Sequence, residues 1–340
     1  MERWGSGHLL PSKIRAAQTM KRVLLAGGAG FLGSHLSLAL LQHGYEVICL
    51  DNFYTGHWRN LQTCQMSPYF HVLEQDIRTP LDIAADYVLN FACPASPPHY
   101  QKDPIYTHQT NVLGTLNLIE NALRYQAIFL QASTSEVYGN PLEHPQSETY
   151  WGNVNSFGPR ACYDEGKRLA EALLYDYHHQ KGLDIRIARI FNTYGPHMDA
   201  LDGRVISNFI IQALQHRPLT IYGSGMQTRS FCYVEDLVQG ILALLHTSPP
   251  IHTPVNLGNP EEHTLQEIVA RILQLTQSQS TLSYHPLPTD DPTQRCPNIK
   301  KAVELLKWSP KISLENGLKQ TIEYFQQTMA EPSINFVEIE

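Results

Sequence analysis

The feature that most restricts how this chain folds is an apolar run near its start that breaks into regularly spaced glycines. Residues 23–26 are apolar and predict a buried parallel strand, and the apolar residues 36–41 predict a helix. Between them stand Gly27, Gly30 and Gly33. In this spacing the first glycine permits a tight turn, the second lets backbone approach a pyrophosphate, and the third lets the helix pack on the strand. Amide groups at the helix start then face the phosphate, so the stretch predicts a dinucleotide site.

A second strand supports this interpretation because it ends in an acidic residue. Residues 45–50 predict the strand, and Asp51 follows near the roughly 20-residue offset at which a carboxylate binds the ribose hydroxyls of adenosine. The carboxylate would repel a 2′-phosphate, which favours NAD, while Arg59 keeps NADP as an alternative. Further cofactor contacts are expected in the turn and at later strand ends, at Phe31, Leu32, Asn52, Tyr54, Thr55, Gly56, Asp76, Ile77, Ala92 and Ser133.

A membrane anchor is the competing interpretation of the same region, since lysines and arginines precede a mostly apolar segment. The glycines, Ser34 and His35 interrupt that segment, whereas a spanning helix needs about 20 predominantly apolar residues. Residues 1–20 contain no apolar core of the kind found in signal peptides. We therefore expect no membrane association and predict that residues 1–20 form a flexible extension.

Charge and cysteine usage argue against several other classes of protein. The net charge of −7 disfavours a nucleic-acid-binding protein, which is usually basic. The six cysteines form no C-x-x-C pair and the histidines form no H-E-x-x-H pattern, so we expect neither a disulfide framework nor a metal site. A reducing, cytoplasmic location is the simplest inference.

Strand and helix patterns alternate along residues 21–196, which predicts a doubly wound α/β Rossmann domain with a parallel sheet. Its further strands are expected at residues 70–73, 87–92, 127–132 and 184–191, and its helices at residues 110–123 and 160–178. The proline-rich residues 94–98 predict a rigid loop.

The rhythm changes after residue 196. Residues 197–328 predict mainly a smaller, mixed α/β lobe that binds the substrate, with some later segments returning to the Rossmann domain, and residues 329–340 predict a tail. In the lobe, helices are expected at residues 205–214, 234–245, 265–275 and 299–306, a strand at 219–222 and a long loop at 286–297.

Tyr163 and Lys167 lie one turn apart in the predicted helix, so their side chains project from the same face. A tyrosine hydroxyl has a pKa of about 10 and is a poor base, but a neighbouring ammonium and an oxidised nicotinamide both favour the phenolate. The pair therefore suits removal of a proton from a sugar hydroxyl. Alone, this spacing is common on structural helices; here it follows a dinucleotide site and the strand-end cluster of residues 133–135.

Together these motifs resemble the extended short-chain dehydrogenase/reductase family, and within it the UDP-glucuronate decarboxylases. The similar segments lie at residues 27–33, 94–98, 134–139, 158–168, 189–196, 227–229 and 256–262. The residues after Thr134 distinguish the relatives. Nucleotide-sugar 4,6-dehydratases typically have Asp-Glu there and 4-epimerases have small residues, whereas this chain has Ser135 and Glu136, like the decarboxylases.

The resemblance implies NAD-dependent decarboxylation of UDP-glucuronate to UDP-xylose through a 4-keto intermediate. Tyr163 would remove the proton of the 4-hydroxyl while hydride passes to NAD. The carboxylate is then β to a ketone and leaves as carbon dioxide, after which hydride returns to the ketone. Thr134 would bind the keto oxygen with Ser135 beside it, while Glu136 and Arg295 would orient the carboxylate and help deliver the replacing proton.

The resemblance also implies a UDP-sugar site and a homodimer formed through a helical bundle that includes the helix bearing Tyr163. The expected substrate contacts are Pro94, Ala95, Asn192, Arg204, Asn208, Tyr222 and Arg229, with Arg229 as the diphosphate clamp.

Two departures concern the substrate. Gln109 stands where the decarboxylases often have a lysine, and His197 stands where an arginine is expected. Both remove positive charge that could face an anionic substrate. A 4-epimerase or 4,6-dehydratase remains the alternative enzyme, and a nucleotide-sensing binding protein the alternative outside enzymes.

Overall fold

The computed structural model describes residues 20–287 and 294–330. Residues 1–19 of the predicted extension, residues 288–293 of the predicted loop and residues 331–340 of the predicted tail lie outside these ranges. Within the described part of the chain, no helix combines the length and apolar character that crossing a membrane requires.

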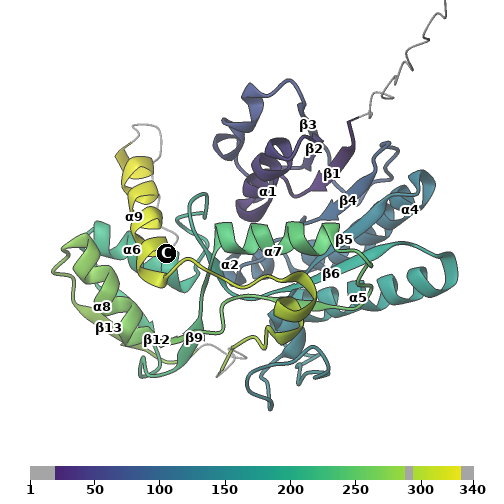
Figure 1. The fold of residues 1–340 in the computed structure, drawn as a ribbon. Helices are drawn as coiled ribbons and strands as arrows, with labels where there is room; N and C mark the ends of the chain where they lie inside the picture. Colours follow the sequence, from purple (N-terminus) through teal and green to yellow (C-terminus); the bar gives the residue numbers. More distant parts are fainter. Residues whose placement is uncertain (1–19, 288–293, 331–340) are drawn as a thin grey trace, which may run out of the picture.

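A parallel sheet of seven strands forms the centre of the described structure (Figure 1). Its strand order is β3-β2-β1-β4-β5-β6-β11, and every neighbouring pair is parallel. The strands are β1 (Arg22–Ala26), β2 (Glu46–Asp51), β3 (Phe70–Glu74), β4 (Tyr87–Asn90), β5 (Ile128–Thr134), β6 (Ile185–Ile190) and β11 (Val255–Leu257). The first six follow the order of a dinucleotide-binding Rossmann sheet, so the predicted doubly wound α/β fold is confirmed.

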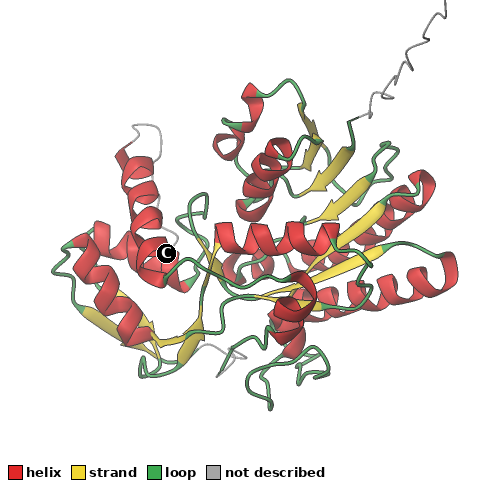
Figure 2. Cartoon of the chain, in the orientation of Figure 1, coloured by secondary structure: helices red, strands yellow, loops and turns green. Residues whose placement is uncertain are grey.

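Helices cover both faces of this sheet, as Figure 2 shows. The helices are α1 (Phe31–Gln42), α2 (Pro97–Lys102), α3 (Pro104–Gln109), α4 (Thr115–Tyr125), α5 (Ala161–Lys181), α6 (Val205–Leu214), α7 (Val234–His246), α8 (Leu265–Thr276) and α9 (Leu314–Ala330). Short 3₁₀ or π turns are η1 (Trp58–Leu61), η2 (Cys64–Met66), η3 (Thr110–Gly114), η4 (Ser135–Tyr138) and η5 (Ala302–Leu306).

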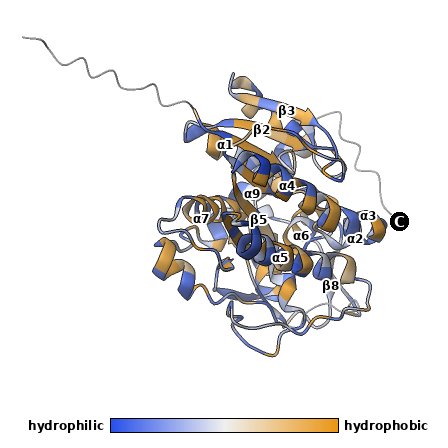
Figure 3. Ribbon diagram, turned by 90° about the vertical axis from the view of Figure 1, so that its right-hand side faces the viewer, coloured by the Kyte–Doolittle hydropathy of each residue, from blue (hydrophilic) through white to orange (hydrophobic). Residues whose placement is uncertain are grey.

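Alternation along β1 explains why the sheet is covered twice. Val23 and Leu25 pack into one hydrophobic cluster with residues of α1 and α7, whereas Leu24 and Ala26 pack into a second cluster with residues of α4 and α5. All four side chains are fully buried. Figure 3 shows hydrophobic segments running through the strands and the helices that flank β5. A strand buried on both faces is typical of parallel sheets.

The C-terminal lobe lies beside the sheet, at the left of Figure 1. It contains α6, α8 and α9 with three small two-stranded sheets, which pair β7 (Thr193–Tyr194) with β10 (Cys232–Tyr233), β8 (Leu219–Tyr222) with β13 (Leu282–His285), and β9 (Thr228–Ser230) with β12 (Glu262–Thr264). One hydrophobic cluster joins Ile206, Ile268 and Phe325 of this lobe to Val23 of β1. The lobe and the sheet therefore share a continuous core.

Several elements differ from the sequence expectations. Pro97 and Pro98 begin helix α2 instead of a loop, because proline is tolerated in a first helical turn whose amides have no intrahelical acceptor. β11 lies in the main sheet beside β6 although its residues follow position 196. Helix α9 was not expected and extends through Ala330, into the residues assigned to a tail. The division of the chain into two domains at residue 196 stays a prediction.

Candidate active site

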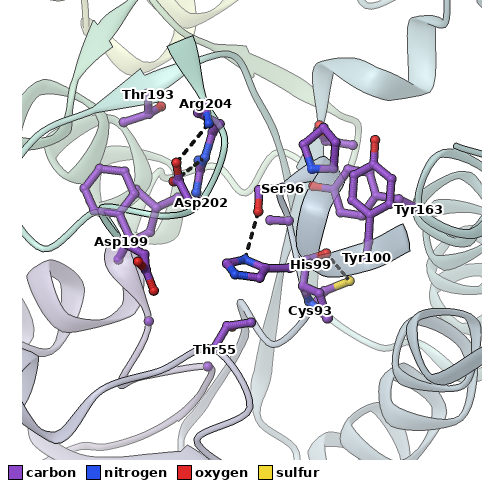
Figure 4. A pocket seen from close by; sticks show the side chains of 18 of the residues that line it. Thr55, Cys93, Ser96, His99, Tyr100, Tyr163, Thr193, Asp199, Asp202 and Arg204 are labelled. Atoms are coloured by element: carbon purple, nitrogen blue, oxygen red, sulfur yellow. Dashed lines mark hydrogen bonds and ion pairs between the residues drawn. The ribbon is translucent and has the colours of Figure 1, made fainter. Parts of the chain in front are cut away.

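One cavity of about 640 Å³ lies where the carboxyl ends of the sheet strands face the C-terminal lobe. It includes the point between β1 and β4 where the strand order reverses, which is where α/β proteins of this kind bind ligands. Figure 4 shows side chains from both halves of the chain around it. Every residue that the sequence nominated for catalysis, cofactor or substrate lines this cavity except Gly56.

The glycine turn leaves no room for larger residues at two positions. Gly27 has a φ of +80°, and a Cβ there would lie 2.5 Å from the backbone carbon of Phe91. A Cβ on Gly33 would lie 2.0 Å from the carbonyl oxygen of Gly27, so α1 packs directly against the turn. Gly30 is the N-cap of α1. A Cβ added there would have one neighbour within 4 Å, the carbonyl oxygen of Gly27 at 3.3 Å. The turn therefore presents an open helix N-terminus to the cavity, which fits a pyrophosphate.

Asp51 holds this turn in place as well as lining the cavity. Its carboxylate accepts hydrogen bonds from the backbone amides of Ala29 and Phe53, both at 2.9 Å. Burial is the main influence on Asp51 and raises its pKa despite these bonds. Because a carboxylate has about four lone-pair sites, it can still accept from ribose hydroxyls. Gly56 lies behind it, since a Cβ there would come within 3.0 Å of the Asp51 carboxylate.

Asp76, an expected cofactor contact, also stabilises its own loop. Its carboxylate caps a turn by accepting the backbone amide of Arg78 at 2.8 Å, and it also lines the cavity. Burial would raise the pKa of Asp76, but the Arg78 side chain and Asn52 outweigh burial and lower it. Arg59, the cation that kept NADP open, does not itself line the cavity, although its neighbours His57 and Asn60 do.

The expected catalytic pair, Tyr163 and Lys167, lines the cavity from α5. Tyr163 and Lys167 project from α5, with the Lys167 ammonium 5.8 Å from the Tyr163 ring centre. The ammonium donates to the carbonyl of Ala132 at 2.9 Å, which fixes it beneath β5. Tyr100 on α2 stacks on Tyr163 with ring centres 5.1 Å apart, a contact visible in Figure 4. The sequence did not single out Tyr100, which lies just after the proline-rich residues 94–98 and outside every element expected there.

Burial controls the protonation of this pair. It is the main cause that raises the pKa of Tyr163, and the nearby Cys93 adds to it, while a hydrogen bond with Thr134 acts in the opposite direction. Burial also lowers the pKa of Lys167. Ser133 donates to Glu171 of α5, so this predicted cofactor residue also ties β5 to the helix.

Glu136 forms the most concentrated charge cluster of the site. Its Oε2 lies 3.0 Å from Nη2 of Arg160 and 3.1 Å from Nη2 of Arg295. Burial would raise the pKa of Glu136, but the two guanidinium groups outweigh it and lower the pKa. Arg295 also donates to the carbonyls of Ser135 and Gly139, which joins the late loop to η4. Arg160 was not nominated as a site residue, although it stands in a motif three residues before Tyr163.

The opposite wall of the cavity comes from the lobe. Arg204, at the start of α6, pairs with Asp202 at 2.8 Å, as drawn in Figure 4. Arg229 on β9 is buried and donates to the carbonyl of Thr228. The other nominated substrate residues line the cavity between them or at the β4 and β6 ends, namely Pro94, Ala95, Asn192, Asn208 and Tyr222.

The two departures occupy different places from those first considered. Gln109 does not line the cavity and accepts a hydrogen bond from Arg78 at 2.7 Å. His197 does line it, but its Nδ1 lies 2.8 Å from the hydroxyl of Ser34 on α1, near the glycine turn. Burial, with His35 adding to it, lowers the pKa of His197 to about 4, so this side chain is neutral at pH 7.

One group of side chains in the described ranges has the proximity that a metal ion requires. The ligand atoms of His144, Glu262 and Cys296 lie within 4.8 Å of one another. His144 already pairs with Glu262 at 2.9 Å, and burial together with Glu262 raises the pKa of the Cys296 thiol to about 12. A metal prefers the thiolate, so this arrangement does not favour an ion. The absence of a metal from the reaction stays a prediction.

Comparison with known proteins adds to this geometry. A model of the NAD dependent epimerase/dehydratase family matches residues 23–258. The chain belongs to this family. Among curated members, UDP-glucuronic acid decarboxylase 1 of Danio rerio is 50% identical over 325 residues, covering 96% of this chain and 77% of that protein. UDP-glucuronic acid decarboxylase 6 of Arabidopsis thaliana is 48% identical and covers 95% of each chain.

Solved structures of family members are more distant in sequence but similar in fold. A UDP-glucuronic acid 4-epimerase from Bacillus cereus, in complex with UDP-glucuronic acid and NAD, has a TM-score of 0.83 and 30% identity, covering 90% of this chain and 99% of that one. DesIV, a dTDP-glucose 4,6-dehydratase from Streptomyces venezuelae with NAD and TYD bound, has a TM-score of 0.83 and 26% identity, covering 90% and 97%.

Proposed function

We propose that this chain decarboxylates UDP-glucuronate to UDP-xylose with NAD as a tightly held cofactor. The observation that carries the proposal is the buried Glu136 between Arg160 and Arg295, in the same cavity as Tyr163, Lys167 and Thr134. A cluster with two cations and one anion has a net positive charge that suits the carboxylate of the substrate. Curated relatives at about 50% identity carry the same activity in their names.

The first task of the site is to form the 4-ketone. Bound oxidised NAD supplies the hydride acceptor and a positive charge near the phenol. Tyr163 takes the proton of the 4-hydroxyl. Burial raises the pKa of this phenol, and the positive charge that bound NAD would supply acts in the opposite direction. Lys167 lies on the same helix face, with its ammonium 5.8 Å from the Tyr163 ring centre, and adds a second cation.

The second task is to stabilise negative charge while carbon dioxide leaves. Departure of the carboxylate β to a ketone pushes an electron pair onto the keto oxygen. Thr134 and the Tyr163 hydroxyl stand at the end of β5 and on α5 to donate to that oxygen. Arg160 and Arg295 hold Glu136, which in this mechanism faces the carbon next to the ketone, where the new C–H bond is made.

Epimerases and dehydratases share the first task, so the second task separates the candidates. A 4-epimerase must let the keto sugar rotate in the cavity so that hydride returns to its opposite face. A 4,6-dehydratase must eliminate water. Neither reaction needs two arginines on a glutamate at the carboxylate end. A nucleotide sensor needs neither this cluster nor the tyrosine and lysine pair.

Product analysis of the purified chain tests the proposal. Incubation with UDP-glucuronate and NAD should give one carbon dioxide per UDP-xylose, with no net accumulation of NADH. A product of unchanged mass would indicate 4-epimerisation and would overturn the proposal. Omitting NAD should leave activity in proportion to the cofactor that co-purifies.

A cytoplasmic homodimer completes the proposal. All six cysteines are free, as expected of a chain that works in a reducing compartment. Apolar side chains are exposed on the helical side that bears Tyr163, at Leu113 of η3 and at Leu169 and Tyr175 of α5. Leu169→Arg should shift the sedimentation of the protein from dimer to monomer. An unchanged dimer would place the interface elsewhere.

A further inference from the structure

Decarboxylation consumes a proton, which raises the question of where the buried site obtains it. The proton that leaves the 4-hydroxyl returns to it when the ketone is reduced. The C–C bond, however, is replaced by a C–H bond whose proton must come from water. One proton per turnover therefore has to enter a cavity that the bound UDP-sugar and cofactor fill.

A second cavity adjoins the same charged cluster and offers an entry route for the proton. It has a volume of about 400 Å³ and lies between η4, the segment at residues 153–155 and the start of α5. Glu136 and Arg160 line both this cavity and the sugar cavity, so their side chains form the wall between the two. Asp164 lines the second cavity but not the sugar cavity.

Asp164 has an unusual environment for a carboxylate. The residue is 6% exposed, and no hydrogen-bond donor among the described residues reaches its Oδ1. Its Oδ2 lies 4.0 Å from Nε of Arg160, too far for a hydrogen bond, whereas Glu136 lies 3.0 Å from Nη2 of the same guanidinium. Arg160 thus gives its close contact to Glu136 and leaves Asp164 weakly paired beside it.

The charges around the two carboxylates divide their roles. Burial is the main cause that raises the pKa of Asp164, to about 7; Glu136 and Glu165 also raise it, while Arg160 and Arg295 lower it. The pKa of Glu136 is lowered instead, because both guanidinium groups contact it. At neutral pH Asp164 can therefore store a proton that Glu136 cannot.

Two further groups near Asp164 do not change this division. Tyr100 on α2 and Cys162 on α5 both interact with it, and burial raises the pKa of each. Both therefore stay uncharged near pH 7. The protonation of Asp164 near neutral pH is then set by burial and by the glutamates and arginines around it.

From the two cavities and their shared wall, we propose that Asp164 supplies the proton that replaces the departing carboxylate, passing it through Glu136. Asp164 does not line the sugar cavity, so it acts on the sugar only through Glu136. This inference rests on the proposed decarboxylation and adds the path by which its proton arrives.

The step balances in protons and electrons. The pair from the breaking C–C bond moves into the enolate as carbon dioxide leaves, and it then forms the new C–H bond with a proton from Glu136. Because Glu136 is ionised at neutral pH, it takes that proton from Asp164 before passing it on, and Asp164 is then reprotonated from solvent through the second cavity. No oxidant or reductant is needed beyond the cofactor of the proposed reaction.

The test compares the wild type with Asp164→Asn and Asp164→Glu, using Asp176→Asn as the control. Asp176 is exposed on the same helix and lines neither cavity, so it undergoes the same chemical change without the proposed role. Single-turnover mixing follows ketone formation by NADH absorbance and decarboxylation by carbon dioxide release, each between pH 5.5 and 8.5. Sodium formate, a small acid that the second cavity can admit, is added in a parallel series.

In the wild type, the rate of decarboxylation should fall as the pH rises above about 7, because less Asp164 is then protonated. We call this fall the limb of the pH–rate profile. The rate of ketone formation should show no such limb. Asp164→Asn should slow product formation by roughly 10- to 100-fold, somewhat below the roughly 10²–10⁴-fold typical of a direct proton donor. The Asp164→Asn variant should also lose the limb near pH 7, and added formate should restore its rate of decarboxylation. Asp164→Glu should restore part of the rate and the limb.

Other results would overturn the inference. A slow Asp164→Asn variant that keeps the limb and ignores formate would mean that Asp164 only supports Arg160. A wild type without the limb would exclude the relay even if Asp164→Asn did not fold. Failure of the proposed function is distinguishable, because the wild type would then release no carbon dioxide at any pH.

Discussion

The two ends of the main cavity are built in different ways. The cofactor end consists of backbone shaped by adjacent sequence: Gly27 and Gly33 meet through their backbones, and Asp51 accepts two main-chain amides. The carboxylate end consists of side chains from three distant segments, with Glu136, Arg160 and Arg295 meeting at about 3 Å. A local backbone motif thus shapes the cofactor end, whereas in the proposed mechanism the reaction depends on long-range ion pairs.

The largest expected effect breaks the cofactor end. Gly33→Ala places a Cβ 2.0 Å from the carbonyl oxygen of Gly27, so α1 must move away from the turn. We expect a loss of at least about 3 kcal/mol in unfolding free energy, the upper range for overpacked sites, and no measurable NAD binding. Thermal unfolding and NAD titration measure both quantities.

Gly30→Ala is the matched control at this end. Its Cβ would meet one atom at 3.3 Å, so the fold should lose only about 1 kcal/mol, as at other N-caps. The NAD affinity should nevertheless fall at least tenfold if the pyrophosphate lies against the turn. Equal stability losses in the two variants would contradict a turn built by close backbone packing.

The next effect breaks the carboxylate end while sparing the cofactor. Glu136→Gln keeps the shape of the side chain but removes the anion between Arg160 and Arg295. We expect decarboxylation to slow by roughly 10²–10⁴-fold, because proton transfer is lost, and ketone formation to change by less than about tenfold. Stopped-flow NADH absorbance should then rise and persist with the carboxylate intact. Equal loss of both steps would argue against the separation of the two ends.

A smaller effect concerns the stability of the carboxylate end. Arg295→Met removes one of two cations from buried Glu136 and should cost about 3 kcal/mol, the low end for a broken buried pair, because Arg160 remains. Lys319→Met, which breaks an exposed pair with Glu315, should cost much less, because water screens the two charges. Urea unfolding at pH 7 measures both. Similar losses would mean that the buried cluster adds no special stability.

The same cluster should make stability depend on pH. The folded-state pKa of Glu136 is lowered relative to an unfolded value of about 4.3, so its stabilising contribution is complete above that value. The contribution is lost as the pH falls through the lowered, folded-state pKa. Urea unfolding between pH 3 and 6 should show a decline that is shallower in Glu136→Gln. Parallel curves for the two proteins would contradict this assignment.

The smallest effect tests the boundary of the substrate site. Gln109 contacts Arg78 outside the cavity, so Gln109→Lys should change KM for UDP-glucuronate by less than about twofold. A lysine there would face Arg78 and have no substrate to contact. A tenfold lower KM would show that this position does reach the sugar.

The sequence predicted the structure correctly where a motif consists of residues close together in the chain. The spacing of Gly27, Gly30 and Gly33 requires a strand, a turn and a helix in that order, and the structure has them. Reasoning failed at Pro97, which begins a helix. It expected some later segments to return to the Rossmann domain but did not identify β11 as the strand that joins the main sheet. A short strand carries little local signal, because its partner and not its own sequence decides the pairing.

By itself, the sequence determined the strand–turn–helix unit, the acidic end of β2 and the helix face that pairs Tyr163 with Lys167, since each follows from steric and periodic rules over a few residues. Only the tertiary structure decided that Arg160 and Arg295 share Glu136, and that Asp164 lines a second cavity together with Glu136 and Arg160. Burial and the distances between distant segments set the charge of these groups, and no local pattern encodes either one.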